Sequence, residues 1–383
     1  MHPSGQRSIE RRSGVEVARR RVARRPPLAA LGVVVVVALA LGGCGREGDG
    51  AVTMSTEQSG SVGFDQLSEP SDLAPVALPD DVYVLIDGGD RQRDTATSTA
   101  VWRVDADGAH DLATVPVPLR SPVAWSSGDD EVTVVGMNCS TLVDGEGRPT
   151  CAEAPLVAAV IDLEGEVETW ALGVVTSGEV GFSAGRLGDA GIAVVATDPA
   201  TADPHALTVA ATGEQAVEQG VVDASLVCAS PEVTALVPRE LAPGTNQVLR
   251  IATGGVEPIG VVPPPDAELA AVTGCTDGAV LVRALSGLGV QDLRFSTAAP
   301  AKLTTLEVPP RFAAGEVDLG SGGRAFSWTA DGETWRLAEE RDGAWTAVGQ
   351  IASQEPPQRT VRGETTYAAL VLTDGNPTFE VIG

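Results

Sequence analysis

Few residues of this sequence have the type and spacing that catalysis requires. Apart from His2 near the N-terminus, the sequence has two histidines, His110 and His205, and they do not share a metal-ligand spacing. The two tyrosines, Tyr83 and Tyr367, each lie in an apolar run typical of a buried strand. The one Gly-x-Ser-x-Gly match, GFSAG at 181–185, lies in an all-β pattern without the strand–turn–helix context of a nucleophile elbow, and the sequence contains no glycine-rich phosphate loop. These observations favour a protein that is not an enzyme and needs no cofactor or metal.

Charged side chains in two long insertions are better candidates for ligand binding. The insertions span 87–99 and 139–151, and their candidate binding residues are Asp90, Arg91, Arg93, Asp94 and Arg148. The arginines are notable because the chain is strongly acidic. Loops on a rigid scaffold often carry binding residues. We therefore predict a binding surface at these loops; the alternative is that they are solvated insertions without a function.

The elements that must position these loops follow an all-β pattern. From residue 80 onward, short apolar runs alternate with Gly, Asp and Pro turns, and few segments show a helical period. A strand–turn–strand unit recurs every 42 to 57 residues, and a second strand pair lies between its copies. The equivalent positions of the recurring unit are Trp102, Ala159, Leu207, Leu249, Leu293, Leu337 and Phe379. Four antiparallel strands per repeat predict the blade of a β-propeller.

The pattern resembles seven-bladed β-propellers in general, without the Gly-His and Trp-Asp signature of WD40 blades. We expect seven blades, with six as the alternative if the weak unit near 180–222 is misread. The seventh repeat ends at its third strand, because the chain stops at Gly383. The segment 60–79 is expected to supply the missing strand of the last blade and the first strand of the first blade, which would protect two sheet edges.

One segment, Ser327 to Trp335, reads SWTADGETW and resembles an Asp-box hairpin. The spacing from Asp331 to Trp335 is one residue shorter than in the usual S-x-D-x-G-x-T-W form. Asp boxes occur in sialidases and in many non-enzymatic propellers, so the resemblance implies a structural turn. A sialidase-like site would also need an arginine cluster and a tyrosine nucleophile with a carboxylate partner.

The N-terminal segment has the features of an export signal. Residues 1–27 hold eight arginines and two glutamates, and a 14-residue apolar run follows over 28–41. A membrane-spanning helix needs roughly 20 residues, so the run fits a signal peptide better. The sequence then reads Leu41-Gly42-Gly43-Cys44, which resembles the lipobox of bacterial lipoproteins. An uncleaved anchor helix is the alternative, and the export route, Sec or twin-arginine, stays open.

The lipobox resemblance implies a signal peptide over 1–43, an acylated Cys44 carrying palmitate, and a lipid anchor in the cell membrane, facing the outside of the cytoplasmic membrane. We expect 44–79 to be the lipidated cysteine and a flexible linker, and 80–383 to be the propeller domain. The whole chain carries a net charge of −26. Removing the signal peptide leaves a net charge of about −32, which repels nucleic acid.

Four cysteines remain after Cys44, and an even number in an exported chain predicts two disulfides. The repeat register selects the pairs Cys139–Cys151 and Cys228–Cys275. The first would close the loop between the second and third strands of the second blade. The second would join the inner strands of consecutive blades; its alternative is a pair of buried, reduced thiols.

These features together predict an extracytoplasmic lipoprotein whose propeller binds or scaffolds without catalysing a reaction. Its partner would be an envelope protein, a glycan or a small solute, in addition to the membrane reached through the lipid. The alternative is an extracellular hydrolase or lyase that acts on glycans. A third idea is that the domain modulates a neighbouring membrane protein.

Overall fold

A computed structural model describes the chain in the following segments: 61–62, 67–68, 70–89, 97–139, 151, 153–176, 181–188, 191–196, 206–221, 228–229, 235–242, 245–252, 255–262, 267–276, 279–286, 289–296, 299–307, 317–319, 324–331, 334–353, 355–373 and 375–383. The chain divides into two compact units, Met1–Gly50 and Ala51–Gly383, and every described residue belongs to the second. The predicted signal peptide and Cys44 therefore lie outside the described residues. Within the described segments, no helix is long and apolar enough to cross a membrane.

The described strands form seven antiparallel sheets of four strands each. The first sheet contains β2 (Leu73–Ala77), β3 (Tyr83–Asp87), β4 (Thr99–Asp105) and β5 (Gly108–Val115). The second contains β6 (Arg120–Ser126), β7 (Glu131–Met137), β8 (Ala154–Asp162) and β9 (Val167–Thr176). The third contains β10 (Phe182–Leu187), β11 (Gly191–Ala196), β12 (Ala206–Ala211) and β13 (Val217–Val221). Two short 3₁₀ turns, η1 (Pro70–Asp72) and η2 (Pro79–Asp81), flank β2.

The remaining sheets repeat this order. The fourth contains β14 (Cys228–Ala229), β15 (Ala235–Ala242), β16 (Thr245–Ala252) and β17 (Gly255–Val262). The fifth contains β18 (Ala267–Thr276), β19 (Ala279–Ser286), β20 (Gly289–Ser296) and β21 (Ala299–Thr305). The sixth contains β22 (Val317–Leu319), β23 (Ala325–Asp331), β24 (Thr334–Arg341) and β25 (Ala344–Ala352). The seventh contains β26 (Arg359–Arg362), β27 (Tyr367–Thr373), β28 (Asn376–Ile382) and β1 (Ser61–Val62).

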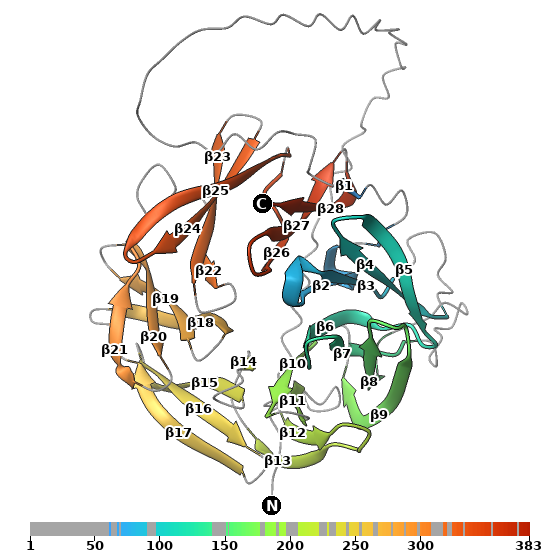
Figure 1. Cartoon of the computed structure of the whole chain (residues 1–383). Helices are drawn as coiled ribbons and strands as arrows, with labels where there is room; N and C mark the ends of the chain where they lie inside the picture. The colour runs from blue at the N-terminus through green and yellow to red at the C-terminus, as the bar shows by residue number, and fades with distance from the viewer. Residues whose placement is uncertain are drawn as a thin grey trace, which may run out of the picture. The chain divides into compact units, whose positions relative to one another are not determined.

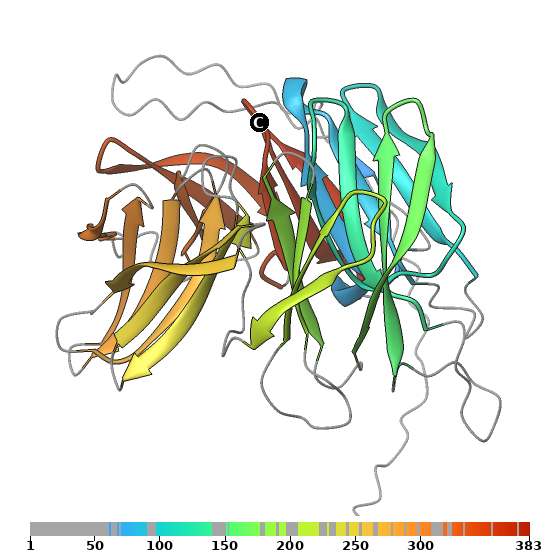
Figure 2. The same cartoon turned by 90° about the horizontal axis from the view of Figure 1, so that it is seen from below.

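The sheets of the second unit follow one another around a common centre (Figure 1). The first strands of consecutive sheets are in contact from β2 through β6, β10, β14 and β18 to β22, and β26 contacts β2. Strands of each sheet run between the two faces of this arrangement (Figure 2). The chain thus has an all-β fold with a β-propeller arrangement, as the sequence predicts.

The repeat register read from the sequence is also found in the structure. The equivalent positions lie in the third strand of each sheet, and each pairs with the second strand, as in Leu85↔Trp102 and Leu370↔Phe379. At four of these positions the pairing with the fourth strand shifts register: Trp102, Leu207, Leu249 and Leu337. Such bulges increase local twist. The weak repeat near 180–222 forms a sheet of its own, β10–β13.

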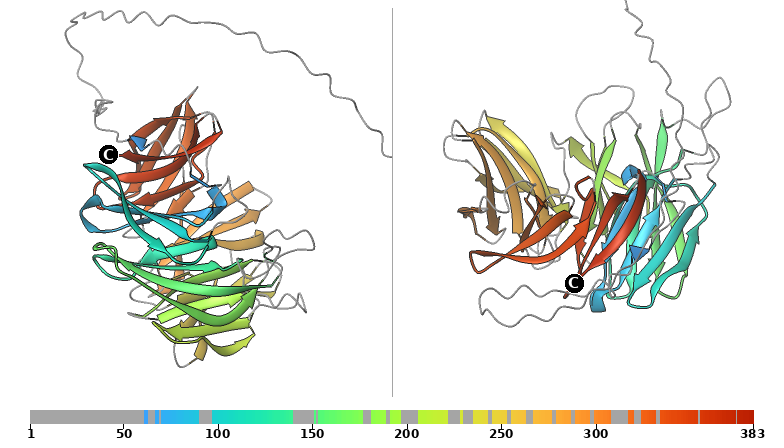
Figure 3. Two further views of the ribbon diagram at one scale, coloured as in Figure 1. Left: turned by 90° about the vertical axis from the view of Figure 1, so that its right-hand side faces the viewer. Right: turned by 90° about the horizontal axis from the view of Figure 1, so that it is seen from above.

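The N-terminal segment takes part in the first and last sheets. Ser61 and Val62 pair with Glu380 and Phe379, so β1 is the outer strand of the seventh sheet. The strand β2 then begins the first sheet. The blue strand β1 lies beside the red strands near the C-terminus in both views of Figure 3. The segment 60–79 therefore supplies one strand to the last sheet and one to the first, as the sequence analysis expected.

The hydrophobic core is divided among the junctions between neighbouring sheets. One cluster, which includes Val84, Ile86 and Val134, lies between the first and second sheets. Similar clusters lie between the second and third, fifth and sixth, sixth and seventh, and seventh and first sheets. A sheet of this kind buries both faces only by stacking on its neighbours, which explains why the repeated strands are apolar on both sides.

Candidate functional site: the loop face of the first two sheets

The first predicted binding loop leaves the first sheet from a tightly held position. Asp87 is buried at the end of β3, and its carboxylate accepts hydrogen bonds from the amides of Ser68 (3.3 Å) and Gly89 (3.2 Å). Burial raises the pKa of Asp87, while these hydrogen bonds lower it in part. The Gly88 amide donates to the Asp72 carbonyl at 2.8 Å. A side chain at Gly88 would overlap the Leu119 carbonyl, so only glycine fits there.

The other end of the same loop is held by one hydroxyl group. Thr99 is fully buried, and its Oγ1 donates to the Val117 carbonyl at 2.9 Å. The same oxygen accepts the Leu119 amide at 2.8 Å. This end of the loop is therefore fixed to the segment that connects the first and second sheets, whereas the Asp87 end is fixed to the segment that precedes β2. The predicted binding residues Asp90, Arg91, Arg93 and Asp94 lie between these ends, outside the described residues.

An ion pair connects the first loop to the root of the second. Arg120, the first residue of β6, places Nη1 2.8 Å from Oδ2 of Asp72. The other oxygen of Asp72 accepts the Ser121 amide at 3.0 Å. Arg120 also pairs with Met137, the last residue of β7, from which the second loop departs. Asp72 thus contacts the start of one predicted loop through its carbonyl and the base of the other through its carboxylate.

The second predicted loop is closed by a covalent bond. Cys139 and Cys151 form a disulfide, which confirms this part of the predicted pairing. Cys139 is buried among apolar residues between the second and third sheets. Next to it, the Asn138 amide donates to the Pro155 carbonyl at 2.9 Å. Arg148, inside the loop, lies outside the described residues.

The second predicted disulfide is not described at the level of side chains. Cys228 begins β14 and Cys275 lies near the end of β18. These are the first strands of consecutive sheets, and they are in contact. The backbone placement agrees with the predicted register, and the bond itself stays a prediction.

A further arginine lies at the same end of the sheets. Arg359 is the first residue of β26. This strand contacts β2, which begins directly after Asp72. The Arg359 side chain reaches solvent, yet the surrounding protein desolvates it enough to lower its pKa, an effect that the Asp72 charge offsets in part. Among the described residues it makes no hydrogen bond or ion pair. Arg359 therefore adds an uncommitted cation beside the two loop roots.

A second group of charged residues surrounds Glu339 between the sixth and seventh sheets. Arg324 and Arg341 donate to the fully buried carboxylate at 3.0 and 2.9 Å, and Nε of Arg362 lies 3.6 Å away. Burial raises the pKa of Glu339, but the arginines outweigh this and leave it below the usual 4.5. Burial, followed by the charge of Glu339, raises the pKa of the adjacent Tyr367. An activated nucleophile needs the opposite shift, so we interpret this group as structural.

The other residues considered for catalysis are also committed to packing or exposed. Tyr83 is buried, shares a 2.7 Å hydrogen bond with Thr366, and has its pKa raised by burial to about 12. His110 lies 3.9 Å from Asp105 on an exposed hairpin, and His205 lies outside the described residues. In the described part of the chain, no three His, Cys, Asp or Glu side chains are grouped to hold a metal.

The hairpin that resembles an Asp box has a structural role. Trp328 is buried, and its indole nitrogen donates to the Thr360 hydroxyl at 2.9 Å. At the turn, the Thr334 hydroxyl donates to the Asp331 carbonyl at 2.9 Å. The Asp331 carboxylate pairs with Arg336 at 2.5 Å on the surface. The hairpin therefore attaches the sixth sheet to the seventh.

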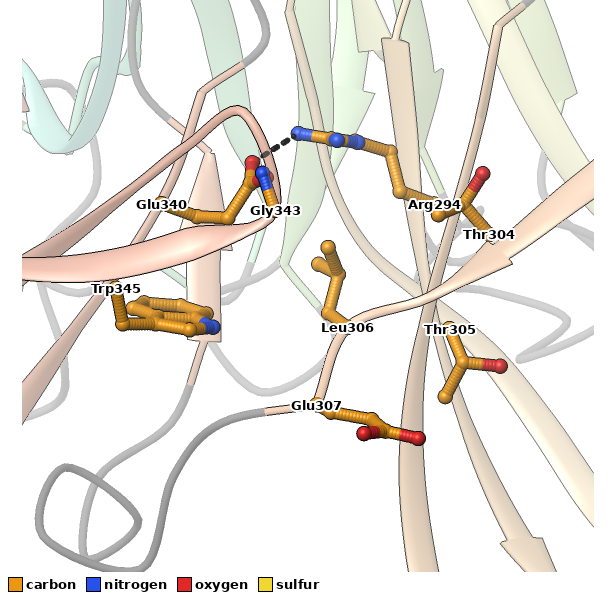
Figure 4. Close-up of a pocket in the computed structure, with 8 residues that line it drawn as sticks. All are labelled: Arg294, Thr304, Thr305, Leu306, Glu307, Glu340, Gly343 and Trp345. Atoms are coloured by element: carbon orange, nitrogen blue, oxygen red, sulfur yellow. Dashed lines mark hydrogen bonds and ion pairs between the residues drawn. The ribbon is translucent and has the colours of Figure 1, made fainter.

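A small cavity lies between the fifth and sixth sheets, away from the loops (Figure 4). Its volume is about 190 Å³. Residues of β20, β21, β24 and β25 contribute to its wall, together with Leu306 and Glu307, which follow β21. Arg294 and Glu340, both in the wall, form an ion pair at 2.9 Å (Figure 4).

The comparisons with known proteins indicate a fold and no family. No protein-family model matches the sequence, and a search of curated proteins finds no relative. A solved prolyl endopeptidase aligns with 82% of this chain and 47% of its own, at 11% identity and a TM-score of 0.51. The acylaminoacyl peptidase of Pyrococcus horikoshii aligns with 78% and 50%, at 13% identity and a TM-score of 0.49. This chain thus spans about half the length of either peptidase, and at these identities the likeness concerns the fold alone.

Sequence reasoning located the two loops but missed the residues that hold them. Arg120 and Arg359 are the first residues of inner strands and Asp72 directly precedes one, and at such positions charged residues carry no periodic signal. Their neighbours in space come from segments far apart in the chain. Only the strand register, once assigned, indicates that the starts of β2, β6 and β26 meet at one end of the sheets.

Proposed function

We propose that this protein is a non-catalytic binding or scaffolding lipoprotein, anchored through Cys44 outside the cytoplasmic membrane. It binds its partner with the loop face, which is the end of the first two sheets from which the loops 87–99 and 139–151 leave. The observation that carries the proposal is the Arg120–Asp72 ion pair, which fixes the bases of both loops in one place. A loop that is held at its base loses less conformational entropy when it binds a partner. The partner would be an envelope protein, a glycan or a small solute.

The state of the other ionisable groups supports binding over catalysis. Glu339 is neutralised by arginines, and both tyrosines have raised pKa values, so these groups are poorly suited to attack a substrate. The strong negative charge of the chain favours a partner that is neutral or basic overall. Arg359, and the loop arginines predicted from the sequence, would then select an acidic group within that partner.

Site-specific photocrosslinking on intact cells tests this proposal. A photoreactive amino acid would replace Thr97 in the first loop or Glu153 beside the second, both of which are exposed. The control position is Thr346, exposed on β25 of the sixth sheet. We expect the same partner to be captured from Thr97 and Glu153 but not from Thr346. Equal capture from all three positions, or capture only from Thr346, would reject the loop face as the binding surface.

A glycan-active hydrolase or lyase is the second candidate, and the convergence of Tyr367, Glu339 and three arginines is the observation that favours it. Release of sugar from purified cell-envelope glycan would be measured for the full chain and for Tyr367→Phe. Activity that the substitution abolishes while the protein stays folded would replace the binding proposal by this one.

We also infer that the seven sheets are the blades of one closed ring, with β1 completing the last. Each junction of first strands from β2 to β22 is in contact, as are β26 with β2 and β25 with β28. An experimental structure with a different number of sheets around the axis would contradict this inference.

A further inference from the structure

The single carboxylate of Glu339 holds more arginines than its neutralisation requires. Arg324 and Arg341 each contact one of its two oxygens, at 3.0 and 2.9 Å, and Nε of Arg362 lies 3.6 Å away. One guanidinium balances one carboxylate, so two of the three positive charges remain, on a chain whose net charge is −26. We propose that these three arginines, the arginine cluster, bind a phosphate group, as a site separate from the loop face.

Arg324 and Arg341 keep unused donors at the surface. Their side chains are 47% and 55% exposed, whereas Glu339 is fully buried. Arg324 donates to Glu339 through Nη1 alone, and Arg341 donates through Nε and Nη2. A guanidinium has five N–H donors, and neither arginine makes another hydrogen bond to a described residue. The remaining N–H groups can therefore bind an anion that arrives from solvent.

Glu339 also holds the two exposed guanidinium groups next to each other. Arg324 directly precedes β23 and Arg341 ends β24, and both reach the same carboxylate. The orientation of the Arg341 guanidinium is fixed, because its Nε and Nη2 share one oxygen of Glu339. Adjacent like charges repel each other in the free protein, and a bound anion would relieve this repulsion. Donors that are already in position lose little conformational entropy on binding.

Arg362 contributes its charge to the cluster, while its donors serve the fold. Its Nη1 donates to the Gly363 carbonyl at 3.1 Å and its Nη2 to the Glu364 carbonyl at 3.3 Å. The guanidinium also lies 5.7 Å from the centre of the Tyr367 ring. Only 10% of this side chain is exposed, so we expect Arg324 and Arg341 to make the direct contacts with the ligand.

The surplus charge favours a phosphate over a carboxylate. A phosphate monoester carries a charge of about −1.5 to −2 near neutral pH and has three strong acceptor oxygens. It therefore matches both the two unbalanced charges and the several unused donors. A carboxylate supplies one negative charge and two oxygens, which leaves part of the cluster unbalanced.

Two exposed acids, Asp342 and Glu364, lie in the turns that follow Arg341 and Arg362. Within the described segments, neither forms an ion pair with the arginine cluster. Water and salt screen exposed charges that are not in contact. The arginines that share the Glu339 carboxylate are therefore the charges that a ligand meets directly.

The arginine cluster lies at the opposite end of the sheets from the loop face. Arg362 is the last residue of β26, whereas Arg359, beside the loop roots, is the first residue of the same strand. A ligand of the cluster therefore does not compete for the loop face. The two sites can be tested separately.

Phosphorus NMR on the full chain, in a polyoxyethylene detergent without phosphate, tests the proposal. The probes are inorganic phosphate and glycerol 3-phosphate, whose lines broaden when they bind. We expect Arg324→Gln to weaken binding about tenfold, because a charge-assisted hydrogen bond is lost. The matched control is Arg336→Gln, on the same strand as Arg341. Arg336 is 53% exposed and pairs with Asp331 alone, so its loss should leave binding unchanged.

Urea denaturation shows whether each variant is folded in the assay. Should Arg324→Gln not fold, Arg324→Lys takes its place, since it keeps a charge beside Glu339 but loses the planar fork of donors. No binding of either phosphate to the wild-type chain, or unchanged binding in the folded variant, would overturn the proposal. A loss in Arg336→Gln equal to that in Arg324→Gln would also overturn it, because the attraction would then be general.

Competition experiments identify the chemistry and the source of the ligand. Acetate should displace phosphate only at about tenfold higher concentration, and displacement at equal concentration would reject the assignment to phosphate. Glycerol 3-phosphate that binds at least as tightly as inorganic phosphate would identify a phosphate ester as the source, and weaker binding would identify the free ion. Photocrosslinking from Thr97 should be unaffected by Arg324→Gln, so a failure at one site is distinguishable from a failure at the other.

Discussion

The guanidinium of Arg120 lies 2.8 Å from the carboxylate of Asp72 and joins the bases of two loops that leave different sheets. Asp72→Asn keeps the oxygen that accepts the Ser121 amide but removes the charge. We expect the free energy of unfolding to fall by about 1 kcal/mol, since the pair is only partly buried, and photocapture from Thr97 and Glu153 to fall together. Urea denaturation and the capture assay measure the two effects.

Asp105→Asn is the matched control for that substitution. Asp105 pairs with Arg103 at the same distance of 2.8 Å, within one hairpin of the first sheet. It should leave capture at wild-type level. A loss of capture in Asp105→Asn equal to that in Asp72→Asn would mean that the effect is general and unrelated to the loop bases.

The Cys139–Cys151 disulfide should contribute to stability and to loop geometry. It closes a loop with a sequence separation of 12 residues. Replacing both cysteines by serine should lower the free energy of unfolding by roughly 3 kcal/mol in the chain-entropy model. Thermal denaturation of the oxidised protein and of the double variant measures the difference. Equal melting temperatures would show that the closed loop is no constraint on the unfolded chain.

Glu339 should make stability dependent on acid. Its pKa in the folded protein is below the usual 4.5, so its stabilising effect is complete above pH 4.5 and is lost as the pH falls through the folded value. At neutral pH, Glu339→Gln should cost about 2 to 3 kcal/mol, because three arginines lose their carboxylate. The difference between wild type and variant should shrink below pH 4.5, as measured by urea denaturation across pH. Glu364→Gln, at an exposed acid in the nearby turn, should show no such difference.

Asp81 should stabilise the junction between the first and last sheets. Its carboxylate accepts hydrogen bonds from the amides of Thr365 and Thr366, both at 3.0 Å, and from the Thr365 hydroxyl. Asp81→Ala should cost about 1 to 2 kcal/mol, since two backbone donors lose their partner. Hydrogen exchange should accelerate mainly in β27 and β28. Asp80→Ala, at the exposed neighbouring residue, should leave exchange unchanged; acceleration in both variants would assign the effect to the turn itself.

Cys44 should determine the location of the protein. If the lipobox prediction is right, Cys44→Ser removes the site of acylation and releases the domain from membranes. Cell fractionation and incorporation of labelled palmitate measure this. Retention of the serine variant in the membrane fraction would indicate that the apolar run 28–41 remains as an anchor.

Much of the fold could be predicted because it depends on local patterns. The spacing between Trp102, Ala159 and their equivalents identified the third strand of every sheet, since a repeated sheet repeats its turns and its apolar faces. The early end of the last repeat predicted that an upstream strand completes it, and β1 pairs there with β28. The segment 60–79 was likewise expected to supply the first strand of the first sheet, and β2 pairs there with β3.

The candidate site could be predicted only in outline. Long insertions between strands are visible in sequence, and so are their charges. The Arg120–Asp72 contact joins residues 48 positions apart, and the Arg294–Glu340 contact joins residues 46 positions apart. No periodicity links such partners, because each depends on how one sheet is rotated against the next. The cavity beside Arg294 has the same origin and leaves no trace in the order of residues.

The pairing of β1 with β28 also has a consequence for biogenesis. Tyr83 and Thr366, which meet between the first and seventh sheets, are 283 residues apart, and β28 follows every other described strand in the chain. Both contacts can therefore form only after all the described strands have been synthesised, and loop-closure entropy slows their formation further.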